Sequence, residues 1–311
     1  PPSPSRYPHG RSRPPSYRRV WTASGSSPPR TVRTADDFSS TGFADATIEF
    51  IDRQSQSDQP FFAWVSFTAP HDPRTPPADI RARIDDDALT LPPNVLPQHP
   101  FDNGELEIRD EKLEAWPRTP AALRRHLGDY YGMIEQLDQQ VGRILKALEA
   151  SGEADNTIVV FLADHGLGMG SHGLLGKQNL YEHSAGAPVI LAGRGFDTAK
   201  RPSQLIYLHD LVPLLYQRAG VDAPDDLHGR SPDKTVRSDL VLNYRNLQRA
   251  LVEERWKLIA YPRPKADITL LQLYDLRNDP HELRNLAGDT AQEERVARML
   301  ATLRTRIDRK S

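Results

Sequence analysis

The stretch TIVVFLADHGLGMGSHGLLGKQNLYEH, residues 157–183, changes character at Asp164. Seven strand-forming or small residues come first, and an acid, an imidazole, five glycines, a second imidazole and a lysine follow. A short apolar run of this kind is typical of a buried strand. Ligands of open parallel sheets bind outside the carboxyl ends of strands. The residues that follow the apolar run are therefore candidates for a functional site.

Asp164 and His165 place one carboxylate oxygen and one imidazole nitrogen side by side, and Gly166 lets the backbone turn away. This pair resembles half of a divalent metal site. The alternative is a turn that ends the strand with a capping carboxylate. That turn is the favoured interpretation of the tripeptide alone, so the decision depends on the surrounding sequence.

A second candidate follows another apolar run. PFFAWVSFT, residues 60–68, predicts a buried strand, and the sequence APHDPRTPP comes directly after it. The carboxyl ends of two parallel strands meet at one sheet edge, so His71 and Asp164 are expected to converge there. The proline-rich segment from residue 69 to about 120 is too long for an ordinary connection and predicts a functional, substrate-facing loop.

The remaining patterns predict an α/β domain with a mostly parallel sheet and flanking helices. Residues 41–54 predict a helix with Phe43, Ile48 and Ile51 toward a core. The segment from residue 121 to Gly152 predicts a long helix whose apolar positions are Leu127, Tyr131, Ile134, Leu137, Val141, Leu145 and Leu148. APVILAG, residues 187–193, predicts another strand, and residues 205–220 predict an amphipathic helix.

The C-terminal part has a different pattern. SDLVLNY, RALVEE and WKLIAY are short strand patterns at the spacing of an antiparallel meander, and a charged helix from about residue 291 to 309 follows them. We therefore predict a catalytic domain over residues 35–231 and a small α+β subdomain with an antiparallel sheet over residues 232–311.

Composition limits the classes of function. The 311 residues are 38% hydrophobic with a net charge of -2, so no overall field favours nucleic acid or an anionic membrane. The apolar runs are far shorter than the roughly 20 residues that cross a bilayer, and no signal peptide is recognised. The absence of cysteine excludes disulfides, thiolate metal sites and a cysteine nucleophile.

The first 34 residues contain eight prolines, seven serines, seven arginines and no acidic residue. This composition predicts a disordered basic segment, either an arm that binds RNA or a membrane surface, or an out-of-frame translation of a GC-rich gene. We favour the second hypothesis because the change of composition is abrupt. Reading the DNA in three frames tests it. Another frame should encode, over residues 1–34, sequence of the same family that residues 36–306 resemble, and further upstream paired aspartates and a nucleophile motif.

The wider pattern D-H-G-x-x-x-G-x-H-G-L-x-G-K at residues 164–177 resembles the metal and anion loop of the sulfatase family in the alkaline-phosphatase superfamily. FTAPHDPRTPP resembles the A-P-H-x-P segment of that family. Further resemblance lies in YYGMIEQLDQQVGRILKALEASG, LHDLVPLLYQRAGVDAP, HGRSP, RWKLIAY and LYDLRNDPHELRNLA. Together these segments cover about residues 36–306, and they imply the alkaline-phosphatase-like fold.

The resemblance implies roles for individual residues. Asp164 and His165 would be two ligands of Ca²⁺ or Mg²⁺, and Lys177 would bind the sulfate. His71 would contact the sulfate ester. His172 would be a further contact or a proton donor to the leaving group, with a turn residue as the alternative. The family often has an arginine near Gly186, which this sequence lacks, so His183 is only a candidate supporting residue.

The resemblance leaves other parts of the family's site unassigned. The family has two more metal-binding aspartates and a C/S-x-P-x-R motif whose first residue becomes formylglycine, the nucleophile. PSPSR, residues 2–6, has proline at the nucleophile position and lies too close to His71. We therefore expect an N-terminally incomplete chain that is inactive alone and binds Ca²⁺ no tighter than roughly millimolar.

Three functional hypotheses follow. The first is a sulfuric ester hydrolase that acts on a small-molecule or carbohydrate sulfate ester, with a periplasmic or extracellular location suggested by the family. The second is a phosphate or phosphonate ester hydrolase of the same superfamily. The third is a non-enzymatic truncated paralogue. We favour the first as the function of the lineage.

Overall fold

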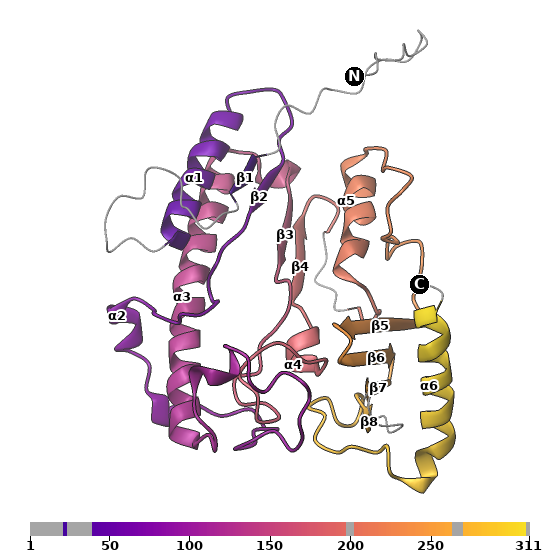
Figure 1. Cartoon of the computed structure of the whole chain (residues 1–311). Helices are drawn as coiled ribbons and strands as arrows, with labels where there is room; N and C mark the ends of the chain where they lie inside the picture. Colours follow the sequence, from indigo (N-terminus) through magenta and orange to yellow (C-terminus); the bar gives the residue numbers. More distant parts are fainter. Residues whose placement is uncertain (1–20, 24–38, 197–201, 263–269, 309–311) are drawn as a thin grey trace, which may run out of the picture. The chain divides into compact units, whose positions relative to one another are not determined.

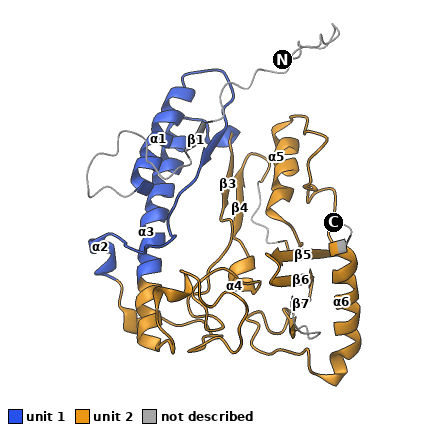
Figure 2. Cartoon of the chain, in the orientation of Figure 1, with its two compact units in different colours: residues 1–83, 129–156 blue, residues 84–128, 157–311 orange. Residues whose placement is uncertain are grey.

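The computed structural model describes residues 21–23, 39–196, 202–262 and 270–308 (Figure 1). They belong to two compact units (Figure 2). The first unit comprises Pro1–Arg83 and Asp129–Asn156, and the second comprises Ile84–Gly128 and Thr157–Ser311. The C-terminal subdomain that the sequence predicts from residue 232 lies within the second unit.

The first unit contains α1 (Ser39–Gln54), which confirms the first predicted helix. Phe43 and Ile51 are buried, and Phe43 packs edge to face against Phe67 with ring centroids 6.3 Å apart. Strand β2 (Ala63–Val65) is shorter than the nine residues expected. It pairs in parallel with β1 (Trp21–Ala23), which is the part of the first 34 residues that the structure describes. The predictions for the rest of that segment lie outside the described residues.

The long predicted helix is confirmed as α3 (Pro120–Ala150), within which the boundary between the units falls. The predicted apolar stripe is only partly correct. Leu127, Leu137 and Leu148 are buried, whereas Tyr131, Ile134 and Leu145 are exposed. The three exposed residues lie close together around the axis of α3. The other described residues therefore cover only part of the apolar surface of this helix. Among the described helices, none has the length and apolarity that crossing a bilayer requires.

In the second unit, β3 (Ile158–Leu162) confirms the strand that precedes Asp164. It pairs with β4 (Val189–Gly193), and the pairing is antiparallel, with Phe161 opposite Ile190. These two strands therefore do not form with each other the parallel pairing that the sequence suggests. The segment between them carries the candidate site and the short helix α4 (Glu182–Ala185).

The C-terminal meander is confirmed as a four-stranded antiparallel sheet in the order β5, β6, β7 and β8. The sequence did not predict its last strand. The elements are β5 (Asp239–Tyr244), β6 (Gln248–Glu253), β7 (Trp256–Tyr261), β8 (Leu270–Asp275) and the following helix α6 (Glu293–Asp308). The remaining helices are α2 (Ala78–Arg81) and α5 (Leu211–Ala219), with 3-10 turns at Asp86–Ala88, Glu111–Leu113, Ala154–Asn156, Leu208–Asp210 and Thr290–Gln292.

The two faces of this sheet are covered by different segments. Alternate residues of β7 point to opposite faces, so Leu258 packs with Met299 of α6, whereas Ile259 packs with Leu174 and Tyr181 of the candidate site loop. Figure 1 shows α6 alongside β5, β6 and β7. The sheet therefore supports the site loop from behind, which gives the C-terminal subdomain a direct role in positioning the site.

Candidate functional site

The carboxyl end of β3 leads through Ala163 into Asp164 and His165. Asp164 Oδ2 lies 3.4 Å from His165 Nε2, and the Asp164 side chain is 85% exposed. His165 Nδ1 lies 2.8 Å from the carbonyl oxygen of Gly166, so this nitrogen carries the proton in the neutral ring. In that neutral ring the lone pair of Nε2 faces the side where Asp164 lies. This is the tautomer in which Nε2 can bind a metal ion.

The donor pair fits a divalent cation. Bonds of about 2.3 Å to one ion place adjacent ligands of an octahedral shell about 3.3 Å apart, close to the observed separation. Within the described residues, however, no group of three or more His, Asp or Glu side chains could hold a metal. The described part of the chain therefore offers two of the six or more ligands that Ca²⁺ or Mg²⁺ takes.

Gly166 is required by close packing. Its backbone N–H donates to the carbonyl of Ser184 at 2.9 Å, and a Cβ at this position would lie 2.1 Å from the carbonyl oxygen of His183. No side chain fits in that space. The glycine therefore lets the backbone after the metal ligands run directly against the segment that contains α4.

The segment from Gly168 to Gly176 is a tight, fully buried loop. Gly168 N–H donates to Gly176 O at 2.9 Å, and Gly170 N–H donates to Leu174 O at 2.8 Å. Met169 and His172 have φ values of 50° and 53°, in the left-handed region that residues other than glycine rarely adopt. The loop is therefore a specific, strained structure that returns the chain to Lys177.

Lys177 lies at the end of this loop with a side chain that is 18% exposed, and its Nζ is 4.0 Å from Asp110 Oδ2. Gln178 Nε2 donates to the same Asp110 oxygen at 3.0 Å, and Arg109 donates to the other oxygen. Burial alone would raise the pKa of Asp110, but these hydrogen bonds and the charges of Arg109 and Lys177 hold it below its usual value. Asp110 is therefore an anionic partner for Lys177.

His172 lies in a buried, stacked position. Its ring stacks on Tyr181 with centroids 3.9 Å apart, and its Nε2 is buried without a hydrogen-bond partner. Burial, together with the positive charges of His99 and Lys257, lowers the pKa of His172 to about 4. A neutral imidazole packed in this way suits a structural role. The expectation that His172 donates a proton to the leaving group stays a prediction, with a structural turn residue as the alternative.

His183 lies beside this stack, with its ring centroid 5.6 Å from those of Tyr181 and His172. Both of its ring nitrogens are buried without a hydrogen-bond partner. Burial lowers the pKa of His183 well below its usual value. It is thus a neutral neighbour of the site loop.

His71 belongs to the first unit, whereas Asp164, His165, His172 and Lys177 belong to the second. Its backbone N–H donates to Thr68 O at 3.0 Å, and its Nδ1 lies 2.8 Å from Asp72 O. The side chain is 44% exposed. His71 therefore occupies a turn shortly after β2, and its expected convergence with Asp164 stays a prediction.

Several residues around the site were not predicted. Asp110, Glu111 and Arg118 contact the loop from a segment with no periodic pattern, so no local signal identifies them. Lys257 is fully buried and pairs with Glu182 and Glu282. The sequence did contain a signal for Lys257 and its two glutamates, because a lysine in the middle of an apolar strand needs buried anionic partners.

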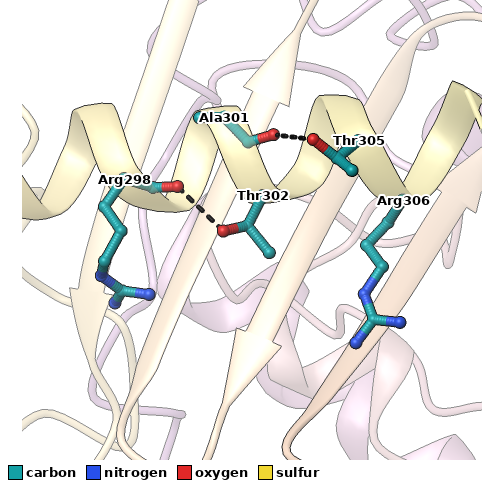
Figure 3. A pocket seen from close by; sticks show the side chains of 5 residues that line it. All are labelled: Arg298, Ala301, Thr302, Thr305 and Arg306. Carbon is teal, nitrogen blue, oxygen red and sulfur yellow. Dashed lines mark hydrogen bonds between the residues drawn. The ribbon is translucent and has the colours of Figure 1, made fainter.

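A groove on α6 lies elsewhere in the second unit (Figure 3). Its volume is about 390 Å³, and Arg298, Ala301, Thr302, Thr305 and Arg306 line it. The two threonine hydroxyls donate to carbonyls of their own helix. Arg298 pairs with Glu253, and Arg306 pairs with Asp239. These polar groups are already engaged within the protein, so we assign the groove no ligand.

Two known proteins similar to this chain are an arylsulfatase and a solved structure described as a sulfatase. An arylsulfatase of Clostridium perfringens is 30% identical over 262 residues, which cover 80% of this chain and 54% of the relative. The chain thus spans just over half the length of that protein. A solved Bacteroides fragilis structure, described as a sulfatase, superposes with a TM-score of 0.68 at 26% identity, over 86% of this chain and 58% of that one.

A phosphonate monoester hydrolase of Agrobacterium radiobacter has a TM-score of 0.69 at 23% identity, over 86% of this chain and 61% of that chain. This likeness shows the shared fold alone. Together with the Bacteroides fragilis structure, it confirms the alkaline-phosphatase-like fold, with mixed helices and sheet and a C-terminal antiparallel sheet.

The model of one protein family, Sulfatase, matches residues 8–221 of this chain. The match begins inside the arginine- and proline-rich segment and includes every predicted site residue. It covers more than half of the sequence. The chain therefore belongs to the sulfatase family of the alkaline-phosphatase superfamily.

Proposed function

We propose that the chain serves the hydrolysis of a sulfate monoester of a small molecule or a carbohydrate. Asp164 and His165 are two ligands of Ca²⁺ or Mg²⁺, and Lys177 binds the sulfate group. The observation that carries this proposal is the placement of the His165 ring, with Nδ1 against the Gly166 carbonyl oxygen and Nε2 3.4 Å from Asp164 Oδ2. The loop that follows this pair ends at Lys177 in the same unit.

Lys177 acts as a fixed positive charge. Its ammonium would attract the sulfate group and stabilise the charge that develops on the bridging oxygen when the ester bond breaks. A divalent cation held by Asp164 and His165 would add further positive charge beside the sulfate group. The A-P-H-x-P resemblance adds His71 as a residue that contacts the ester, a role that we propose from the motif and not from its position.

We further propose that these 311 residues alone do not turn over the ester. The family's formylglycine nucleophile is made from a cysteine or serine. This sequence has no cysteine, and the serine that fits the C/S-x-P-x-R pattern, Ser26 of SSPPR, lies outside the described residues. Two protein ligands also leave most of a Ca²⁺ shell unfilled. The remaining groups would come from sequence beyond these residues, a view supported by relatives that are nearly twice as long.

The alternative substrate class is a phosphonate or phosphate monoester, because a phosphonate monoester hydrolase shares this fold. A sulfate monoester carries one negative charge, and a phosphate monoester carries up to two at neutral pH. One lysine and a cation held by a single carboxylate form a site of modest positive charge. This balance favours the sulfate ester.

Binding of 4-nitrophenyl sulfate to the 311-residue chain, followed by saturation-transfer NMR, tests the proposal. We expect a Kd near the millimolar range, weakened at least about tenfold in Lys177→Ala, since a charge-assisted contact contributes roughly 1.5–3 kcal/mol. The matched control is Lys234→Ala, which removes an exposed lysine of the same unit. Equal binding by both variants would contradict the proposal. Tighter binding of 4-nitrophenyl phosphate or of a phenylphosphonate would favour the alternative.

A further inference from the structure

We propose that Glu111 and Arg118 are positioning residues for Lys177: their buried ion pair fixes the loop that places the lysine beside Asp110. This inference deepens the proposed function and rests on it for the role of Lys177. The pair lies in the predicted loop segment between residues 69 and 120. Arg118 Nη2 is 2.8 Å from Glu111 Oε2, and the two side chains are 0% and 4% exposed.

The Glu111 carboxylate binds the backbone immediately before Lys177. The N–H of Gly176 donates to Oε1 at 2.8 Å, and the N–H of Leu175 donates to Oε2 at 3.0 Å. One carboxylate thus receives two consecutive main-chain donors. Because Leu175 and Gly176 are buried, these N–H groups would otherwise lack partners, and each would cost free energy.

Arg118 binds the opposite side of the same turn. Its Nη1 donates to Gly173 O at 2.6 Å, and its Nη2 also donates to the backbone O of Glu111 at 2.7 Å. Its guanidinium lies over the ring of Trp116, 4.7 Å from the centroid. The charged pair therefore holds a carbonyl and two amides of one short turn, and this fixes the turn more tightly than apolar contacts would.

The fit around Gly176 is close. A Cβ at Gly176 would lie 3.0 Å from Glu111 Oε1 and 3.0 Å from the Asp110 Cβ. Gly176 O also accepts a hydrogen bond from Gly168 N–H, so the clamp extends across the loop. Asp110 thus contacts the side chain of Lys177, and the next residue, Glu111, binds the backbone just before that lysine. Movement of Glu111 would move the lysine relative to Asp110.

A buried ion pair is weak evidence for stability, because removing two charges from water costs about as much as their attraction returns. A purely structural need would be met by apolar side chains of similar volume. Here each charge also has backbone partners that apolar side chains could not satisfy. The pair is therefore best explained by the precision it gives to the turn that carries Lys177.

Two measurements on the 311-residue chain test this without relying on substrate. The first is the acylation rate of the Lys177 amine by an N-hydroxysuccinimide ester across pH 7–10, followed by mass spectrometry. The second is the hydrogen exchange of the Leu175 and Gly176 amides. In Glu111→Gln, which keeps the side-chain shape but loses the charge, we expect amide exchange to accelerate about tenfold or more. The Lys177 amine should be acylated faster, because its part-buried side chain would no longer be held in place.

Glu114→Gln is the matched control. Glu114 also pairs with an arginine, Arg125 at 2.6 Å, and with His126 at 3.1 Å. It acts on Arg118 through its charge alone and makes no hydrogen bond or ion pair with the described residues of the loop. The control variant should leave both readouts within about twofold of the unmodified chain. Arg118→Lys is the second variant, to be used if Glu111→Gln does not fold. It retains the charge and loses the two-pronged geometry, so both readouts should change by an intermediate amount.

Unchanged Lys177 acylation and unchanged Gly176 exchange in a folded Glu111→Gln or Arg118→Lys variant would overturn the proposal. An equal change in Glu114→Gln would overturn it as well. Failure of the unmodified chain to bind 4-nitrophenyl sulfate would instead contradict the proposed function, and it would leave the Lys177 measurements as a valid test of positioning.

Discussion

Lys257 Nζ and Glu282 Oε1 lie 2.9 Å apart, and both side chains are almost completely excluded from solvent. Glu182 Oε1 lies at the same distance from the ammonium, and the Glu182 N–H donates to Glu282 Oε2 at 2.7 Å. The lysine belongs to β7, and Glu182 begins α4. This group of charges therefore fastens the segment that follows the site loop to the C-terminal sheet.

Replacing Lys257 with Met should destabilise the chain by about 3–5 kcal/mol, because Glu282 would remain buried without its partner. Urea denaturation measures this loss. Arg277→Met is the control, because the exposed Arg277–Glu254 pair at 3.1 Å should contribute no more than about 1 kcal/mol. A loss in Lys257→Met no larger than that in the control would show that the buried pair does not fasten the sheet.

The same variant should depend on pH. Burial raises the pKa of Glu282, while Lys257 opposes this rise. Without the lysine, the pKa of Glu282 in the folded chain should rise further above its value in the unfolded chain. The folded chain then binds a proton at Glu282 more readily than the unfolded chain does. The loss of stability should therefore be largest above the folded pKa and should shrink as the pH falls through it. Denaturation at pH 5 and pH 8 tests this, and an equal loss at both would contradict it.

His172 should titrate with a pKa near 4, measured by NMR of its imidazole carbons. A histidine whose folded pKa lies below its unfolded value contributes stability above pH 6.5, and that stability is lost as the pH falls toward 4. The difference corresponds to roughly 3 kcal/mol. A measured pKa of 6.5 or higher would contradict the structural role and support the proton-donor hypothesis.

Gly166→Ala should disrupt the turn that holds Asp164 and His165, because the new methyl group would lie 2.1 Å from His183 O. Overpacking of this kind costs about 1–3 kcal/mol or more. Gly142→Ala is the matched control, since no atom lies within 4 Å of the position that its methyl group would take, and this change in α3 should stabilise the chain by about 0.5–1 kcal/mol. Thermal unfolding of both variants gives the comparison, and a neutral effect of Gly166→Ala would exclude the close packing.

Phe161 and Ile190, which are paired across β3 and β4, are 38% and 59% exposed. An adjacent pair of large apolar side chains should bind a hydrophobic dye. We expect the 311-residue chain to increase the fluorescence of anilinonaphthalene sulfonate, and Phe161→Ser with Ile190→Thr to reduce that increase. Fluorescence that is unchanged in the double variant would place the apolar surface elsewhere.

Much of the fold could be predicted because its patterns are local. The helix α1 and the strands β5, β6 and β7 have regular apolar spacing or short runs between turns. Strand β8 was missed because it is mostly buried on both faces, with Leu273 toward α6 and Tyr274 toward the site loop, so it lacks the alternation of a half-exposed strand.

The site shows the same contrast. Asp164 and His165 are consecutive, so the sequence alone places their donor atoms together. Asp110 and Glu111 meet the Lys177 loop only through tertiary folding, from a segment without a period. The burial of His172 could not be predicted, because a histidine between glycines resembles an exposed turn residue. Its left-handed backbone and its stacking on Tyr181 bury it instead.

The proposed function requires that Asp164, His165 and Lys177 act on one sulfate ester. Two ligands that bind one site each change the affinity of the other by the same factor. We therefore expect Ca²⁺ to bind weakly, with a Kd near the millimolar range, and to increase the affinity of the chain for 4-nitrophenyl sulfate.

Calorimetric titration of 4-nitrophenyl sulfate, with and without 10 mM Ca²⁺ (about ten times that expected Kd), measures this coupling most directly. We predict tighter binding with Ca²⁺ in the unmodified chain, no effect of Ca²⁺ in Asp164→Ala, and weak binding under both conditions in Lys177→Ala. An affinity that Ca²⁺ does not change in the unmodified chain, or that rises equally in Asp164→Ala, would contradict the proposed function.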